Sequence, residues 1–138
     1  MQMRSRAIFA DTSAFLALLN AGDPKHTAAT DTWIRLVERD EYVITSSYTL
    51  IETITLLHSR QGTAIVEQFL SDIMPLVEVV WADVPMHTAA ITAMLAHPGR
   101  SGPSLVDCMS FEVIRQRRIE DAFAYDPHFA GRGFKVIG

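Results

Sequence analysis

The chain is poor in cysteine and in lysine. It has one cysteine, Cys108, and only two lysines, Lys25 and Lys135, among 138 residues. A single cysteine cannot form a disulfide within the chain, so the disulfide-stapled class of small secreted proteins is excluded. Its 12 Lys and Arg residues are outnumbered by 16 Asp and Glu residues, which gives a net charge of -4. Proteins that coat nucleic acid depend on surplus cations to neutralise phosphates, so the overall charge argues against that class while leaving room for a local basic patch.

Long apolar runs and the common nucleotide-binding loops are also missing. No stretch approaches the roughly 18 apolar residues that span a membrane, and no secretion signal opens the chain. We therefore expect no membrane association and a reducing, cytoplasmic setting. Neither G-x-G-x-x-G nor G-x-x-x-x-G-K-[ST] occurs, which excludes the usual nucleotide motifs. Repeats and linkers are absent and 49% of the residues are hydrophobic, so we predict one domain over residues 1-138.

Short apolar runs alternate with helical periodicity along the chain. The runs predict strands at 6-10, 42-45, 77-81, 122-125 and 134-137. The periodic segments predict helices at 12-20, 25-39, 47-60, a fourth from about 63 to 73, 84-96 and 104-118. Strands that alternate with helices form βαβ units. The sequence therefore predicts a three-layer α/β/α fold with a mostly parallel sheet.

Four acids stand at or near the ends of these strands. Asp11 follows the strand 6-10, and Asp126 follows the run 122-125. Glu52 and Asp107 lie in the first turns of helices that follow a strand or the long irregular segment 98-103. Because the carboxyl ends of parallel strands meet at one edge of a sheet, we expect these four carboxylates to gather there.

Each of these acids also has a simpler structural explanation. The segments Thr49–Glu52 and Ser104–Asp107 both have the spacing of a capping box. Asp11 could cap the helix that follows it, and Asp126 before Pro127 could open a turn. The capping explanation suffices for any one acid, and the combination of four is what favours a site.

Four gathered carboxylates need a positive partner. At a separation of 4 Å and an effective dielectric of about 20, each close pair repels by about 4 kcal/mol. Oxygen ligands without a nearby Cys/His cluster favour Mg²⁺ or Mn²⁺ over zinc. Water activated by such an ion, with a second ion assisting the leaving oxygen, is the chemistry that hydrolyses phosphodiesters.

The other polar candidates have weaker patterns. The five histidines have no ligand spacing and are interpreted as surface or turn residues: His26, His58, His87, His97 and His128. Arg115, Arg117 and Arg118 form a basic helix end, which complements the helix dipole or contacts RNA phosphates.

Four short motifs, in order along the chain, resemble those of the PIN-domain nucleases and, within that family, of the VapC-type toxin ribonucleases. They are Phe9–Ser13, Tyr48–Glu52, Ser104–Cys108, and Asp126-Pro127-His128-Phe129 followed by Gly133-Phe134. Asp23–His26, at the start of the second helix, is also similar to the family. The resemblance covers nearly the whole chain.

The resemblance implies a flavodoxin-like strand order and an endoribonuclease that uses Mg²⁺ or Mn²⁺. Its metal-binding and catalytic acids would be Asp11, Glu52, Asp107 and Asp126, with Thr12, Ser13 and Ser104 as supporting hydroxyls. Ala124 departs from the family pattern, which often has Thr or Ser two residues before the fourth acid, and this bears on a second metal position. The resemblance also implies a homodimer held inactive by a cognate antitoxin.

Two other functions remain open. The chain could be a stand-alone PIN nuclease in RNA processing, which a neighbouring antitoxin reading frame would argue against. It could also be a flavodoxin-like signalling module that binds Mg²⁺ without catalysis. Such a module has adjacent acids after its first strand and a lysine after a late strand, and neither feature is present.

Overall fold

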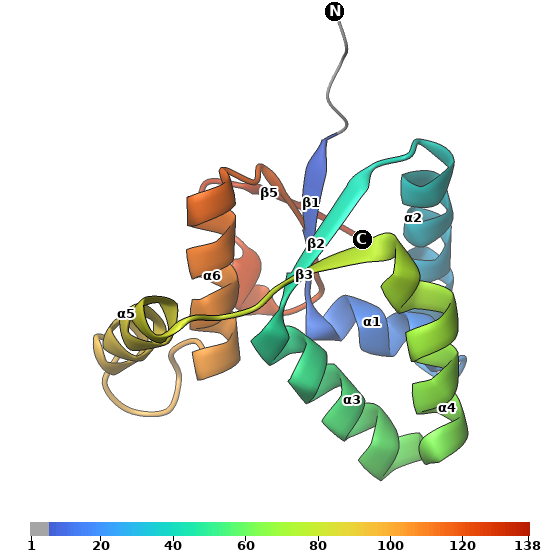
Figure 1. Cartoon of the computed structure of the whole chain (residues 1–138), viewed down its shortest axis with the longest axis horizontal. Coiled ribbons are helices and arrows are strands. Elements are labelled where there is room, and N and C mark those ends of the chain that lie inside the picture. Colours follow the sequence, from blue (N-terminus) through green and yellow to red (C-terminus); the bar gives the residue numbers. More distant parts are fainter. Residues whose placement is uncertain (1–5) are drawn as a thin grey trace, which may run out of the picture.

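The computed structural model describes residues 6–138 and has a sheet of five parallel strands at its centre (Figure 1). In chain order the strands and α-helices are β1 (Ala7–Ala10), α1 (Thr12–Leu19), α2 (His26–Glu38), β2 (Tyr42–Ser46), α3 (Ser47–Gln61), α4 (Thr63–Gln68), β3 (Val77–Val80), α5 (Val84–Leu95), α6 (Leu105–Arg117), β4 (Asp121–Phe123) and β5 (Lys135–Ile137). Helices cover both faces of the sheet, so the predicted three-layer α/β architecture is confirmed. Within these residues, no helix combines the length and apolar composition that crossing a membrane requires.

The strand order is β3-β2-β1-β4-β5, and every neighbouring pair is parallel. It differs from the flavodoxin-like order 2-1-3-4-5 that the resemblance implied. Here β3 continues outward beyond β2, and the chain returns only through α5 and α6, which together carry it to the other side of β1. The alternation of strands and helices in the sequence does not indicate after which strand the chain crosses to the other side of β1. The reversal lies between β1 and β4, and ligand crevices of open parallel sheets form at such a point.

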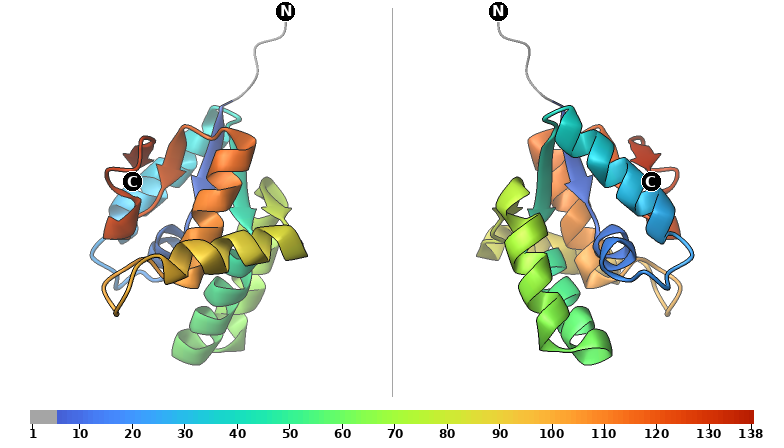
Figure 2. Two further views of the ribbon diagram at one scale, coloured as in Figure 1. Left: turned by 90° about the vertical axis from the view of Figure 1, so that its left-hand side faces the viewer. Right: turned by 90° about the vertical axis from the view of Figure 1, so that its right-hand side faces the viewer.

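Alternating side chains of the strands build two cores. In β1, Ile8 and Ala10 pack with the helices α1 to α4, whereas Phe9 packs with α5 and α6. In β2, Val43 and Ile44 divide in the same way. The two helix layers are seen on opposite sides of the sheet in Figure 2. Burial on both faces explains why these strands are continuous apolar runs and do not alternate with polar residues.

Two predicted elements differ from the observed ones by more than one residue at an end. The fourth helix is α-helical only to Gln68 and continues as a π-helical segment, Phe69–Ile73, and a 3-10 turn, Met74–Leu76. This turn contains Pro75, which has no N–H for an α-helical hydrogen bond. The strand expected at 122-125 begins one residue earlier and ends at Phe123. Its first residue, Asp121, is buried and forms an ion pair with Arg6, a long-range contact that the apolar pattern could not indicate.

Candidate active site

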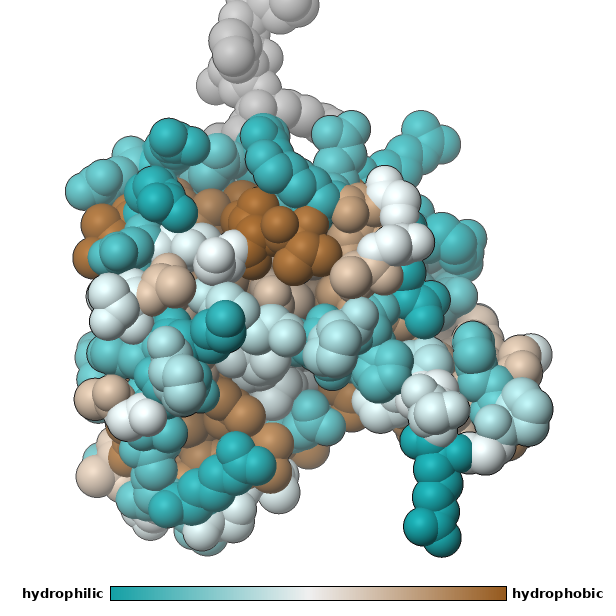
Figure 3. Space-filling view, turned by 180° about the vertical axis from the view of Figure 1, so that it is seen from behind, coloured by the Kyte–Doolittle hydropathy of each residue, from teal (hydrophilic) through white to brown (hydrophobic). Residues whose placement is uncertain are grey.

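All four predicted acids line one cleft at the carboxyl edge of the sheet. The cleft has a volume of about 690 Å³ and lies between α1, α3, the start of α6 and the segment 97–103. From behind, the outline of the molecule is indented between the lobe of α3 and α4 and this segment (Figure 3). The predicted residues on its wall are Asp11, Thr12, Ser13, Glu52, Ser104, Asp107 and Asp126. The structure therefore brings together residues that are more than 100 positions apart in the sequence.

Asp11 is held at the junction of β1 and α1. Its Oδ2 accepts hydrogen bonds from the Ser13 amide at 3.1 Å and from the Ser13 hydroxyl at 2.6 Å, so it is the N-cap of α1. The side chain is nevertheless only 3% exposed. The pKa of Asp11 is raised to about 6, chiefly by burial and to a smaller extent by the charges of Asp107 and Asp126, against the lowering effect of the two Ser13 bonds. Asp11 is thus both a cap and a member of an acidic cluster.

Asp107 has the same double character. It completes a capping box with Ser104, because its Oδ2 accepts from the Ser104 amide at 3.0 Å and its own amide donates to Ser104 Oγ at 3.1 Å. The carboxylate is 5% exposed. Burial is the main cause that raises the pKa of Asp107, and the charge of Asp126 adds to it. The capping explanation and the metal explanation are therefore compatible at this residue.

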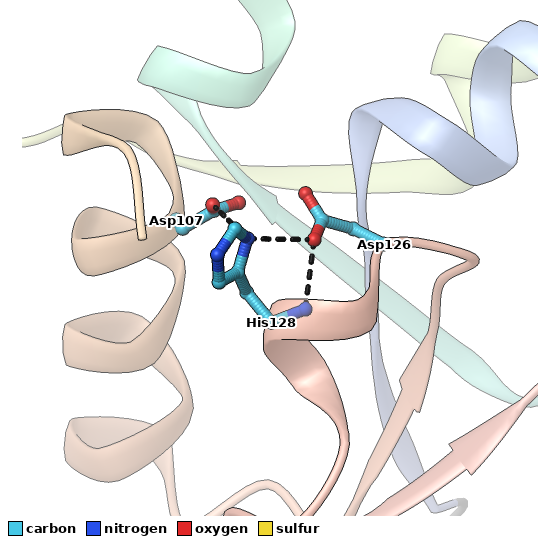
Figure 4. Close-up of side chains that lie close together, drawn as sticks. All are labelled: Asp107, Asp126 and His128. Atoms are coloured by element: carbon cyan, nitrogen blue, oxygen red, sulfur yellow. Dashed lines mark hydrogen bonds and ion pairs between the residues drawn. The ribbon is translucent and has the colours of Figure 1, made fainter. Parts of the chain in front are cut away.

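Asp126 and His128 face Asp107 from the turn after β4 (Figure 4). His128 Nδ1 lies 3.0 Å from Asp126 Oδ1 and 3.5 Å from Asp107 Oδ2, and Nε2 lies 3.2 Å from the Ser101 carbonyl oxygen. Since acceptors face both ring nitrogens, the environment favours the imidazolium. The Ser101 carbonyl is the main cause that raises the pKa of His128, followed by the charge of Asp126.

The interpretation of His128 as a surface or turn histidine is incomplete. It stands in a 3-10 turn, Pro127–Phe129, yet this turn places its ring in the cleft. The signal in the sequence was its position two residues after an acid in a turn that begins with proline. Its ring and the carboxylates of Asp107 and Asp126 offer ligand atoms that all lie within 4.8 Å of one another.

Glu52 reaches the cleft from the second turn of α3. The N-cap of this helix is Ser46, whose hydroxyl accepts from the Thr49 amide at 3.0 Å. The capping box proposed for Thr49–Glu52 is therefore wrong, because the helix begins three residues earlier than that spacing requires. Glu52 has no capping role and is half-buried on the cleft wall.

Hydroxyl groups next to the acids form hydrogen bonds that hold the backbone around the cleft. The Ser13 hydroxyl donates to Asp11 and accepts from the Tyr125 amide at 2.9 Å, which joins the end of β1 to the segment after β4. Thr12 donates toward the Thr49 carbonyl at 3.5 Å and accepts from the Thr53 hydroxyl at 3.3 Å. These uncharged groups position the backbone at the cleft without neutralising the carboxylates.

Ala124, where the resemblance pattern often has a hydroxyl, is buried in the core formed with α5 and α6. Its amide donates to the Ile137 carbonyl at 3.3 Å. The Ser13 hydroxyl already supplies a polar link between the ends of β1 and β4, so the site retains an ordering hydroxyl from another position.

The structure does not bring the predicted arginines to the cleft. Arg115, Arg117 and Arg118 lie at the opposite end of α6 from Asp107 and are exposed. Arg115 pairs with Glu112 at 2.7 Å, and Arg117 pairs with Glu78 at 2.8 Å. The arginine on the cleft wall is Arg100, which sequence reasoning missed because it stands in an irregular segment without periodicity.

The donor set of the cleft suits a hard divalent cation. Two nearly buried carboxylates, Asp11 and Asp107, have raised pKa values, chiefly because burial disfavours their charged forms. Among residues 6–138, His128 is the only cationic group that forms an ion pair with any of the four acids. The carboxylate oxygens of this set are the donors that Mg²⁺ and Mn²⁺ prefer. Asp11 and Glu52 line the same cleft but lie outside the tight group of Asp107, Asp126 and His128.

Comparison with known proteins agrees with this geometry. The family model described as PIN domain matches residues 8–135. Over 131 residues the chain is 36% identical to the 23S rRNA-specific endonuclease VapC20 of Mycobacterium tuberculosis, covering 94% of this chain and 97% of that protein. The crystal structure of M. tuberculosis VapC20, described as a sarcin-ricin loop cleaving toxin, aligns with a TM-score of 0.80 and 34% identity over 92% of this chain and 95% of that one.

Two more distant structures share the fold. VapBC2 from Rickettsia felis, bound to a promoter DNA fragment, aligns with a TM-score of 0.67 and 11% identity over 94% of this chain and 96% of that one. FitAcB from Neisseria gonorrhoeae aligns with a TM-score of 0.67 and 16% identity over 95% of this chain and 96% of that one. The family match and the 36% identity extend over nearly all of the chain, and the chain therefore belongs to the PIN-domain family and resembles its VapC-type members.

Proposed function

We propose that this chain is a Mg²⁺- or Mn²⁺-dependent endoribonuclease and the toxin of a toxin–antitoxin pair. The observation that carries the proposal is the cleft in which four acids from distant parts of the sequence meet, two of them buried with raised pKa values. Bringing four carboxylates together and burying two of them is energetically unfavourable. A structural role alone does not account for this arrangement, because a cap or a turn needs only one acceptor and not a cluster of like charges.

The chain's own residues have distinct tasks in this proposal. Asp107, Asp126 and His128, whose ligand atoms lie within 4.8 Å of one another, hold the ion, and His128 binds it as the neutral imidazole after releasing its second proton. Asp11 and Glu52 line the same cleft and bind the ion directly or through its waters. A bound divalent ion supplies an activated water and stabilises the charge that develops on the phosphate. Ser13 keeps Asp11 oriented, and the Ser104 capping box keeps Asp107 oriented.

RNA is the proposed substrate because VapC20, which is 36% identical to this chain, is named as an RNA-cleaving protein. VapC20 is named as an endonuclease specific for 23S rRNA, which makes ribosomal RNA the first substrate to test. A cognate antitoxin and a homodimer belong to the same proposal, and so does a cytoplasmic location. They rest on the likeness to VapC20, which is described as a toxin. The signalling-module alternative gains no support, because the whole-length match is to PIN domains.

The direct test is cleavage of ribosomal RNA by the purified chain. We expect fragments with Mg²⁺ or Mn²⁺, none with EDTA, and loss of at least about 100-fold in rate for Asp126→Asn, which keeps an acceptor for the His128 amide but removes a ligand charge. Asp83→Asn is the matched control, since Asp83 caps α5 and is absent from the cleft wall. Cleavage by Asp126→Asn at the wild-type rate, or equal cleavage in EDTA, contradicts the proposal.

A further inference from the structure

A second cavity adjoins the acidic cleft and shares Ser13 and Leu16 with it. Its volume is about 450 Å³, and it lies between the end of α1, the end of α3 and Tyr125. The rest of its wall is formed by Ala17, Asn20, Asp23, Lys25, Leu57, Arg60 and Gln61. A chain of nucleotides that crosses the acidic cleft can therefore continue into this cavity over the shared rim.

Two cationic side chains line this cavity, Lys25 and Arg60. Within residues 6–138, neither the Lys25 ammonium nor the Arg60 guanidinium has an ion pair or hydrogen bond to another side chain or carbonyl. The contrast with Arg115 and Arg117 is informative, because both of these pair with carboxylates. The cavity thus presents two uncompensated positive charges beside a cluster of four negative ones.

Neighbouring groups explain why Lys25 stays at the cavity. Its ammonium lies 5.8 Å from the centroid of the Tyr125 ring, which attracts a cation without neutralising it. The one carboxylate on the wall, Asp23, accepts a hydrogen bond from the Lys25 backbone amide at 2.8 Å, so it fixes the start of α2 and does not pair with the ammonium. With Lys25, Arg60 and Asp23 counted together, the wall retains a net positive charge.

Tyr125 adds an unused polar group. Its hydroxyl is buried and is the one buried side-chain oxygen or nitrogen of the described residues without a hydrogen-bond partner. Leaving such a group unpaired costs about 1 to 3 kcal/mol. Burial raises the pKa of Tyr125, so its oxygen stays protonated and can donate. Asn20 and Gln61 supply amide groups on the same wall.

We propose that this cavity is a subsite for the RNA nucleotide next to the cleaved bond, with Lys25 and Arg60 binding its backbone phosphate. The inference rests on the proposed ribonuclease function and extends it to the flanking substrate. Carboxylates at the cleft repel every phosphate of the strand, whereas an ion there compensates only the phosphate that it contacts. The flanking phosphate needs its own cations, and the adjoining cavity supplies two. The amides of Asn20 and Gln61 are suited to sugar or base edges of a single strand.

The test compares the double variant Lys25→Ala/Arg60→Ala with the control Arg39→Ala/Lys135→Ala. The control removes the same charge from exposed residues outside both cavities. Binding of a short fluorescein-labelled single-stranded RNA is measured by anisotropy over a range of salt concentrations, with Asp126→Asn in every chain to prevent cleavage. We expect the double variant to bind at least about tenfold more weakly at low salt. The slope of log affinity against log salt should fall by about 0.7, the value for one single-strand phosphate that the protein no longer neutralises, and the control should change neither quantity to this extent.

Cleavage rates of chains that carry the native Asp126 distinguish a subsite that binds the flanking phosphate from a role of Lys25 and Arg60 at the cleaved bond itself. With a dinucleotide, which has only the cleaved phosphate, the double variant should cut at the wild-type rate, and with longer RNA its KM should rise while kcat changes little. Equal effects of the double variant and the control, or equal loss on the dinucleotide, overturn the subsite. If the wild-type chain cleaves RNA and these losses are absent, only the subsite fails. If the wild-type chain neither binds nor cleaves RNA, the proposed function fails as well.

Discussion

Replacing Asp11 by asparagine should stabilise the metal-free protein while removing metal-dependent activity. Asparagine has nearly the same volume, is an equally good N-cap, and keeps an oxygen for the Ser13 amide and hydroxyl. What it removes is a charge that burial disfavours. The native pKa of about 6 against an ordinary value of 3.8 corresponds to about 3 kcal/mol, at 1.36 kcal/mol per pKa unit. This figure is an upper bound, because asparagine also loses the charge-assisted part of the Ser13 bonds.

The sign of the pH dependence follows from linkage. Since the native pKa of Asp11 lies above its unfolded value, the native state binds the proton more tightly, and the stability of the metal-free wild type falls as pH rises from about 4 to about 6. The variant lacks this loss. The difference in free energy of unfolding between variant and wild type should therefore be near zero at pH 4 and rise toward about 2 to 3 kcal/mol at pH 7.5, or about 5 to 10 °C in melting temperature.

Urea unfolding in EDTA at several pH values measures this difference. The control is Asp83→Asn, which also changes an aspartate N-cap to asparagine but lies outside the cluster. Its stability difference should not grow with pH in this range. In saturating Mn²⁺ the order of Asp11→Asn and wild type should reverse, because only the wild type gains the full binding energy. An Asp11→Asn variant that is no more stable relative to wild type at pH 7.5 than at pH 4 would refute the argument from buried charge.

Two further outcomes are expected. Mn²⁺ at a hundred times its dissociation constant should raise the free energy of unfolding of the wild type by about 2.7 kcal/mol, and thermal melting of Asp126→Asn should respond much less; equal responses would place the ion elsewhere. Ser104→Ala should cost about 1 kcal/mol of stability and retain Mn²⁺ affinity, whereas Asp107→Asn, which keeps the capping acceptor, should retain stability and lose Mn²⁺ affinity in calorimetric titration. Normal Mn²⁺ binding by Asp107→Asn would leave Asp107 with the capping role alone.

Local patterns predicted the layers of the fold and the meeting of the acids. Apolar runs such as Ile8 to Ala10 are buried on both faces, so their strand assignment needed no long-range information. The meeting of Asp11 and Asp126 followed from one rule, that parallel strands end at a common edge. This rule holds for any strand order, which is why the acids were placed correctly although the implied order of the strands was not.

The remaining features depend on contacts between distant parts of the chain. The role of His128 requires Asp107 and the Ser101 carbonyl, both brought to it by the fold. The start of α3 after Ser46 agrees with the predicted helix 47-60, whereas the capping-box spacing of Thr49–Glu52 was misleading because several hydroxyl residues with capping side chains follow one another there. Arg100 reaches the cleft because of the path of an irregular segment, and Arg117 lies away from it because of the direction of α6. The periodicity of apolar residues predicts neither the path nor the direction.

The interior position of β4, between β1 and β5, has a consequence for how the acidic cleft forms. β4 pairs with β1 on one side and β5 on the other, so residues near position 9 must wait for residues near position 122 before this part of the sheet can form. Contacts of such long sequence separation form slowly, because a large loop must close first. Asp126 follows β4 directly, and Ser13 contacts the Tyr125 amide only when β4 is docked. A nascent chain that has not yet folded through β4 carries Asp11, Glu52 and Asp107 but no complete acidic cleft, so the cleft is assembled only after β4 has docked beside β1.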